Sequence, residues 1–353
     1  MKEEILNKIE QYLKTEIYPK AAIIDRDSQA LKKALQGMGK NNLLTLKAPK
    51  KWGGKELSEV AYNCFQIMIA RYSGALAFLQ TQHQSAASQI AASNNDLLKE
   101  KYLAKMATGE VLIGVGFSQL RRQGEPLMKA RLNNGKYELI GEVPWVTGFD
   151  FFQHFIIGAT LPDGGAIYGI LPLENSEKIT ISSPMKLIAM AATNTVSVKV
   201  QGWQLEKENI FAIKPVGAIQ ENDQQKVLHH GFFALGCAQA GLDIMETVYE
   251  QKKLPFVKQA QTSLNQEVNN CREKMLTAAI ANQTFEEKLE LRAKAINLAG
   301  RCAQGAVTVS SGAANYWEHP AGRIYRESLM FTVFGQTTAV MEATLKHLTS
   351  AEK

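Results

Sequence analysis

The sequence has few cysteines, and their spacing does not suit a metal site or a disulfide framework. The four are Cys64, Cys237, Cys271 and Cys302, scattered along 353 residues with no CxxC pair. Structural zinc sites and small disulfide scaffolds need closely paired cysteines. We therefore expect no metal site, no structural disulfide and a reducing, cytoplasmic location.

Long apolar runs and a strong excess of one charge are also missing. No uninterrupted apolar stretch approaches the roughly 18 residues that a membrane span needs. The charged start of the chain precedes no apolar leader, so secretion is not expected. Forty Lys and Arg against 34 Asp and Glu give a net charge of +6. This small balance predicts no nucleic-acid partner, but it is compatible with a small anionic ligand.

Residues 1–110 show helical periodicity. Ile5, Ile9 and Leu13 recur every four residues and form one apolar stripe. A further helix is expected over 97–106, because a run of cap-forming polar residues precedes it and Gly109 follows it.

Residues 111–212 change to a strand pattern. Val196–Val200 alternates apolar and polar side chains, while Phe155–Ala159 and Ala166–Leu171 are short apolar runs separated by turn residues. Short strands at this spacing favour a small barrel or a sandwich over βαβ units.

Residues 222–353 return to helical periodicity. Four long helices are predicted over 224–251, 257–282, 285–310 and 326–349, joined by short links, which is typical of a bundle. The α–β–α order of the three zones excludes a doubly wound dinucleotide-binding fold.

Five segments, in order along nearly the whole chain, resemble motifs of the acyl-CoA dehydrogenase family. They are the P-x-x-[YFW]-G-G turn (Pro49–Gly54), the segment before the first strand (Leu97–Glu110), the flavin segment (Gly141–Thr147), the exit from the β domain (Trp203–Phe211) and the C-terminal block (Ala313–Val340). Each motif alone is moderately specific, but five in the right order strongly indicate a divergent member.

This resemblance implies an α+β multidomain fold. It consists of a helical N-terminal domain (1–110), a small β-barrel domain (111–212) and a C-terminal four-helix bundle (222–353). It also implies a homodimer or homotetramer with FAD between the domains. The substrate implied is an acyl thioester of coenzyme A, dehydrogenated between its α and β carbons.

The ring-binding end of the implied flavin site is retained. The family's W-[IV]-T segment corresponds to Trp145, Val146 and Thr147, and its [VL]-T pair corresponds to Phe117 and Ser118. An indole can cover a ring face, and a hydroxyl can donate a hydrogen bond to the flavin. The alternative interpretation of Trp145 is a residue of the β-domain core.

In the C-terminal block, the family's G-T-S corresponds to Gln336, Thr337 and Thr338, which the resemblance also places at the cofactor.

The phosphate end of the implied flavin site is less well retained. An Arg-x-x-Phe-Gly loop is replaced within Gln251–Val257, and a G-G-x-G motif is replaced by Ser311–Ala314. A lysine lacks the planar fork of arginine. FMN in place of FAD, or weak flavin binding, would each explain these losses.

The family's catalytic glutamate is absent from both places where the family puts it. One base position corresponds to Gly335, or to Phe334 after a one-residue slip, and the other to Lys226. Glycine has no proton acceptor, and lysine is protonated at neutral pH unless it is buried. His229 and His230 lie about a turn beyond Lys226 and are candidates for a displaced base.

The substrate pocket implied by the resemblance has five candidate residues. Leu79 and His83 lie on a predicted helix in the family's substrate-lining region. The other three lie in the predicted bundle and are His230, Phe334 and Gly335. The spacing around His83 also suits a core position.

The segment Glu318–Glu327 resembles a second branch of the superfamily, the flavin monooxygenases. That branch places histidines one and two turns later, where this chain has Phe331 and Phe334. Arg323 and Arg326 in this segment are equally well explained as ion-pairing residues of the bundle.

Three functional hypotheses follow. The leading one is a flavin-dependent oxidoreductase acting on an acyl thioester, with its base displaced or supplied by the substrate. The second is a monooxygenase that uses reduced flavin. The third is a binding or assembly subunit that has kept the fold and lost the chemistry.

Overall fold

Side-chain caps mark where the N-terminal helices begin. Ser58 accepts a hydrogen bond from Ala61 N, and Ser73 accepts one from Leu76 N, so a new helix starts after each serine. The structure, a computed structural model, describes residues 2–349. The helices of its N-terminal part are α1 (Lys2–Tyr12), α2 (Ala21–Ile24), α3 (Ser28–Lys40), α4 (Glu59–Tyr72), α5 (Gly74–Ala92) and α6 (Asp96–Thr108).

The middle of the chain forms one sheet in the order β6-β7-β3-β2-β4-β5-β8, with β1 added in parallel to β4. Within residues 2–349, the end strands β6 and β8 are not paired with each other. The strands are β1 (Ile113–Gly116), β2 (Met128–Asn133), β3 (Lys136–Val146), β4 (His154–Thr160), β5 (Ala166–Pro172), β6 (Ile179–Ile181), β7 (Val196–Leu205) and β8 (Ile210–Lys214).

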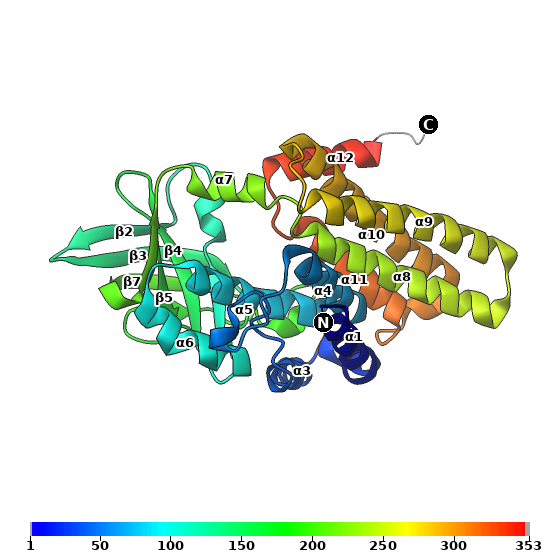
Figure 1. The fold of residues 1–353 in the computed structure, drawn as a ribbon, viewed down its shortest axis with the longest axis horizontal. Helices are drawn as coiled ribbons and strands as arrows, with labels where there is room; N and C mark the ends of the chain where they lie inside the picture. The colour runs from blue at the N-terminus through cyan, green and yellow to red at the C-terminus, as the bar shows by residue number, and fades with distance from the viewer. Residues whose placement is uncertain (1, 350–353) are drawn as a thin grey trace.

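Helices return after the sheet and build the elongated half of the molecule (Figure 1). They are α7 (Ala218–Gln225), α8 (Gly231–Lys252), α9 (Pro255–Ala278), α10 (Phe285–Ser310), α11 (Pro320–Val333) and α12 (Thr338–Thr349). The predicted fold class of helices, a β region and helices again is confirmed.

Two of the predicted long helices are interrupted. The helix expected over 224–251 begins only at Gly231, because residues 226–230 form a turn after α7. The helix expected over 326–349 is divided into α11 and α12 at Gly335, whose φ of +63° ends the helical path. Both turns prove to be parts of the candidate site.

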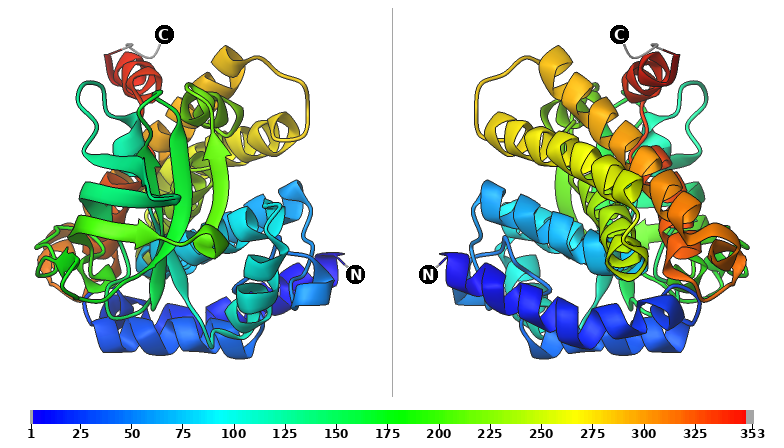
Figure 2. Two further views of the ribbon diagram at one scale, coloured as in Figure 1. Left: turned by 90° about the vertical axis from the view of Figure 1, so that its left-hand side faces the viewer. Right: turned by 90° about the vertical axis from the view of Figure 1, so that its right-hand side faces the viewer.

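Short helical turns connect the longer elements. They are η1 (Leu13–Ile17), η2 (Tyr18–Lys20), η3 (Lys50–Trp52), η4 (Ser118–Arg121), η5 (Ala191–Thr193), η6 (Lys207–Asn209) and η7 (Ser311–Asn315). The N-terminal helices and the C-terminal helix lie on opposite sides of the molecule in both views of Figure 2. No helix between residues 2 and 349 is both long and apolar enough to cross a membrane.

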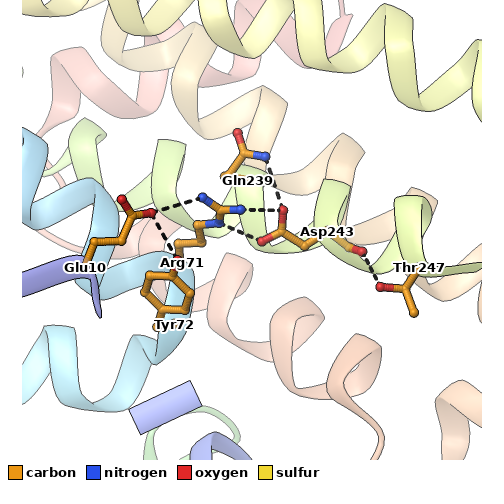
Figure 3. A network of polar contacts seen from close by, with 6 residues as sticks. All are labelled: Glu10, Arg71, Tyr72, Gln239, Asp243 and Thr247. Atoms are coloured by element: carbon orange, nitrogen blue, oxygen red, sulfur yellow. Dashed lines mark hydrogen bonds and ion pairs between the residues drawn. The ribbon is translucent and has the colours of Figure 1, made fainter. Parts of the chain in front are cut away.

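A polar network joins the N-terminal helices to the bundle (Figure 3). Arg71 of α4 donates two hydrogen bonds to Asp243 of α8, at 2.7 and 3.0 Å. Tyr72 Oη donates to Glu10 of α1 at 3.1 Å, and Gln239 supports Asp243 from the same helix at 3.3 Å. The bidentate pair fixes the position of α4 against α8.

Close packing of α8 against α4 requires a glycine, which leads to a testable prediction. A Cβ at Gly236 would lie 2.3 Å from the carbonyl oxygen of Ile67, whereas a Cβ at Gly300 of α10 would meet nothing within 4 Å. We expect G236A to lower the free energy of unfolding by about 1–3 kcal/mol, because the two helices must move apart.

Gly300→Ala is the matched control. It should raise the free energy of unfolding by up to about 1 kcal/mol through helix propensity alone. Urea denaturation of both variants measures the effect. Equal shifts in the two variants would show that the α4–α8 contact tolerates a methyl group.

Candidate functional site

The candidate site lies where the sheet region meets the start of the bundle. Arg121, at the end of η4, donates hydrogen bonds of 2.6 and 2.8 Å to the carboxylate of Asp223 on α7. This partly buried bidentate pair connects the β region to the helix that leads into α8. Figure 1 shows α7 bridging the sheet and the bundle.

Trp145 sits at an irregularity of β3, where the pairing with β7 shifts register between Val143 and Val146. Such bulges redirect side chains away from the regular alternation. The Trp145 side chain is 49% exposed, whereas Val146 next to it is fully buried. Trp145 is therefore not a core residue, and its indole is available to cover a planar ligand.

The three other residues expected at the ring have different environments. Thr147 is buried, and its Oγ1 lies 3.0 Å from Oγ1 of Thr195, so its hydroxyl already has a partner. Phe117 packs edge-on against Tyr168, with ring centroids 5.7 Å apart. Ser118 is exposed at the start of η4. Ser118 and Trp145 are thus the accessible members of the group.

The turn between α11 and α12 contributes one unpaired acceptor. Oε1 of Gln336 is buried and accepts no hydrogen bond in the described structure. Thr337 Oγ1 instead accepts a bond from Val340 N at 3.3 Å and so helps to start α12, while Thr338 is exposed. A buried acceptor without a donor is costly, so Gln336 suits a ligand that carries an N–H group.

Gly335 lies directly against the ring of His230. A Cβ added at Gly335 would be 2.3 Å from His230 Nδ1, so the imidazole occupies the space into which a side chain at position 335 would project. The ring of His230 is also in edge contact with Phe334, at a centroid distance of 4.3 Å. One predicted base position, Gly335, is therefore in contact with His230, a candidate for a displaced base, and only the histidine carries a proton acceptor.

Arg292 of α10 holds this arrangement together. It donates hydrogen bonds to the carbonyl oxygens of Val227, Phe334 and Gly335, at 3.0, 2.9 and 2.8 Å. The guanidinium is buried, and burial lowers its pKa to about 10. One side chain thus ties the turn before α8 to the turn before α12.

Arg292 was not among the candidate residues predicted from the sequence. It lies on the same face of the predicted helix 285–310 as Ile296 and Ala299, at helical spacings. A charged residue on an apolar stripe is the signal that could have found it, since buried arginines require a set of acceptors.

His83 lies in the core between α5, α6 and β1. Its Nδ1 accepts a hydrogen bond from Ile113 N, and its Nε2 lies 3.1 Å from the carbonyl oxygen of Met106. Burial lowers the pKa of His83 to about 4. Because both ring nitrogens have partners and Leu79 beside it is fully buried, this part of α5 has a structural role.

Lys226, at the end of α7, has an exposed side chain. Partial burial and repulsion by Lys47 and Lys214 lower its pKa from the ordinary value. Three lysines therefore converge here, offset by Glu59 and Asp223. An exposed ammonium surrounded by water is a poor base, but the cluster is suited to an anionic ligand.

Known proteins resemble this chain in sequence and in fold. Residues 1–110 match the family described as acyl-CoA dehydrogenase, N-terminal domain. The chain is 24% identical over 260 residues to a 3-(aryl)acrylate reductase of Clostridium sporogenes, covering 71% of this chain and 69% of the reductase. It is 21% identical to the probable acyl-CoA dehydrogenase YngJ of Bacillus subtilis, covering 94% of this chain and 93% of that protein. The family model over residues 1–110 and these relatives place the chain with the acyl-CoA dehydrogenases.

Solved structures of acyl-CoA dehydrogenases share the whole fold of this family member. A glutaryl-coenzyme A dehydrogenase in complex with glutaryl-CoA superposes with a TM-score of 0.84 at 20% identity, covering 98% of this chain and 95% of that chain. An acyl-CoA dehydrogenase from Bacillus anthracis complexed with FAD gives a TM-score of 0.81 at 18% identity, covering 98% of this chain and 66% of that chain.

At the phosphate end, this acyl-CoA dehydrogenase homologue has lysines in place of the arginine loop. Lys252 Nζ donates to the carbonyl oxygen of Val309 at 3.4 Å, and Lys253 pairs with Glu250. An open hollow of about 500 Å³ lies next to this segment, bordered by Tyr249, Pro255, Lys258, Gln259, Thr262, Ser263 and Gln266. Its lining includes Lys258, Gln259 and Thr262, which carry hydrogen-bond donors, but no guanidinium.

Arg323 and Arg326, the two arginines of the monooxygenase-like segment, form ion pairs. Arg323 Nη1 lies 2.7 Å from Glu327, and Arg326 Nη2 lies 2.7 Å from Asp25. The first pair lies within α11, and the second joins α11 to the end of α2. Both arginines are thus ion-pairing residues, as the alternative interpretation of the sequence predicted.

Proposed function

We propose that this chain is a flavin-dependent dehydrogenase that removes hydrogen from the α and β carbons of an acyl thioester. The proposal is supported most directly by the exposed indole of Trp145, at the position that corresponds to the family's flavin segment. It is also supported by relatives that are acyl-CoA dehydrogenases and by a solved neighbour that contains FAD.

The residues at the ring end fit a flavin. Trp145 supplies an uncovered aromatic surface, Ser118 an exposed hydroxyl and Gln336 an unpaired buried acceptor. A bound flavin would accept the hydride that leaves the β-carbon. Between the two flavins, we propose FAD, because a solved neighbour contains it and because the hollow at the far end of α8 could take the phosphate-bearing tail of a flavin held by a neighbouring subunit, even without the arginine fork. FMN is the alternative.

The bundle side of the site suits an acyl chain. Phe78, Phe334 and His230 are in successive ring contact, with centroids 4.9 and 4.3 Å apart. His229 continues this aromatic wall and stacks on Tyr62 at 6.1 Å. An apolar and aromatic wall favours a hydrocarbon or aryl acyl group, and the nearby lysine cluster would favour the anionic coenzyme A portion.

We also propose that the chain forms a homodimer or homotetramer. Two helices of the bundle carry exposed apolar stripes at helical spacing: Tyr325, Leu329 and Val333 on α11, and Met341, Leu345 and Leu348 on α12. Adjacent stripes of this kind are typical of protein–protein contacts. Size-exclusion chromatography with light scattering gives the number of subunits.

The test of the proposed function is the visible absorption spectrum of the purified protein before and after incubation with FAD and with FMN. We expect flavin absorbance that persists after gel filtration and bleaches on anaerobic addition of butyryl-CoA, isovaleryl-CoA or 3-phenylpropionyl-CoA. W145A is expected to weaken flavin retention by roughly 10-fold, as loss of one aromatic stacking partner would. Protein that retains neither flavin would contradict the proposal and support a binding subunit.

A further inference from the structure

The imidazole of His230 is held by ring contacts and leaves its nitrogens free. Across residues 2–349, neither ring nitrogen of His230 has a hydrogen-bond partner, whereas both nitrogens of His83 do. His230 is only partly buried, so a ligand can reach it. Among the pocket candidates, it is the side chain with a basic lone pair available.

Burial, and after it the groups around the ring, keep His230 neutral. Burial lowers its pKa well below 6.5, and His229 on the preceding position, Arg292 on α10 and Arg121 on η4 lower it further. A neutral imidazole can accept a proton at pH 7. The guanidinium groups of Arg292 and Arg121 would stabilise negative charge that develops on a thioester oxygen nearby, which favours removal of the α-proton.

The position of the ring is fixed from both sides. Gly335 has a φ of +63° and leaves room for the imidazole, so a side chain at 335 and the ring at 230 exclude each other. Arg292 binds the carbonyl groups on each side of this contact. The fold thus replaces a base on the turn before α12 with a base on the turn before α8.

We propose that His230 is the general base that removes the α-proton of the acyl thioester, from the space in front of Gly335. This inference rests on the proposed function. In the step, a ring nitrogen forms a bond to the α-proton, the α C–H bond breaks, and its electron pair moves into the thioester carbonyl to give the enolate. The step itself needs no oxidant, so it can be measured without dehydrogenation.

The test follows exchange of α-hydrogens for deuterium in D₂O. The probes are (methylthio)acetyl-CoA and (phenylthio)acetyl-CoA, in which sulfur replaces the β-carbon, so no hydride can leave. With the purified protein as isolated, NMR should show exchange far above the rate in buffer. We expect H230Q to lower the rate of exchange at least 100-fold. Its affinity for the probes, measured by calorimetry, should stay within about 3-fold of wild type.

Two further variants separate a base from a structural residue. K226Q, which removes the other candidate base and one lysine of the proposed coenzyme A cluster, should weaken probe binding but lower the exchange rate at saturating probe far less than H230Q does. In H230G/G335E the ring is gone and a carboxylate enters the vacated space, so exchange should recover at least 10-fold over H230Q. The wild-type rate should stay constant from pH 8 to below pH 6.5 and fall as His230 becomes protonated.

The outcomes distinguish this inference from the proposed function. If the protein binds no flavin but shows exchange that depends on His230, the result would support His230 as the general base and contradict the proposed dehydrogenase function. Retained exchange in H230Q would overturn the assignment of His230, as would a wild-type protein that exchanges neither probe, whatever its flavin content.

Discussion

Replacing Glu327 by alanine is expected to lower the free energy of unfolding by about 3–5 kcal/mol, because it leaves a buried arginine without its counter-ion. Arg323 and Glu327 are 3% and 1% exposed, and Nη1 lies 2.7 Å from Oε1. The same carboxylate oxygen accepts a hydrogen bond from Gly74 N, the first residue of α5, at 3.1 Å. Loss of Glu327 therefore disturbs both the ion pair and the start of the helix that underlies the site.

Urea denaturation of E327A against the wild type measures this effect. The double variant R323M/E327L should recover most of the loss, since apolar replacements leave no unpaired buried charge. The control is E342A, which removes one partner of an exposed i,i+4 pair on α12 and should change stability by no more than about 0.5 kcal/mol. A loss in E327A as small as in E342A would show that the pair is hydrated and does not hold α11 against α5.

Lowering the pH from 7 to 5 is expected to remove about 2 kcal/mol of stability through His83 alone. Burial lowers the pKa of His83 from 6.5 to about 4. In the unfolded chain His83 therefore binds a proton below pH 6.5, whereas in the folded chain it binds that proton only when the pH nears 4. Stability from this residue is complete above pH 6.5 and decreases as the pH falls through that interval.

The hydrogen bonds of His83 explain why the folded state needs the neutral ring. Ile113 N can only donate and Met106 O can only accept, so Nδ1 must be bare and Nε2 must carry the proton. A second proton on Nδ1 would face the N–H group of Ile113. Protonation therefore breaks the link between α5 and β1.

His83→Asn keeps an acceptor near the position of Nδ1 but cannot titrate. The quantity to compare is the loss in unfolding free energy between pH 7 and pH 5, measured in urea for wild type and for H83N. The difference between the two losses isolates His83, because lowered pKa values at His154, His229 and His230 add to both. Equal losses would contradict the structural role of the neutral ring.

The sequence predicted the large-scale organisation of the molecule because local rules decide it. Apolar periodicity, capping residues and turn residues act over a few positions, so they indicated helices such as α6 and α10 near their observed bounds. The order of motifs indicated the family in the same way. The assignment of the family's base positions to Gly335 and Lys226 stays a prediction, because it depends on how the motifs are aligned.

The sequence failed at the two turns that form the site. Residues 226–230 and the turn at Gly335 were predicted as helix, because their local composition does not exclude it. Their backbone instead follows the hydrogen bonds from Arg292, which lies more than 40 residues from either Gly335 or Val227. Such distant contacts override propensity, as is common at functional sites.

What the sequence by itself determined is the fold class and the family, both of which depend on residue types and their local spacing. Only the tertiary structure decided which candidates meet. It placed His83 in the core, exposed Trp145 at a bulge and brought the ring of His230 into the space before Gly335. Residues 230 and 335 are neighbours because α8, α10 and α11 pack together, and packing across a hundred residues is not encoded in any local pattern.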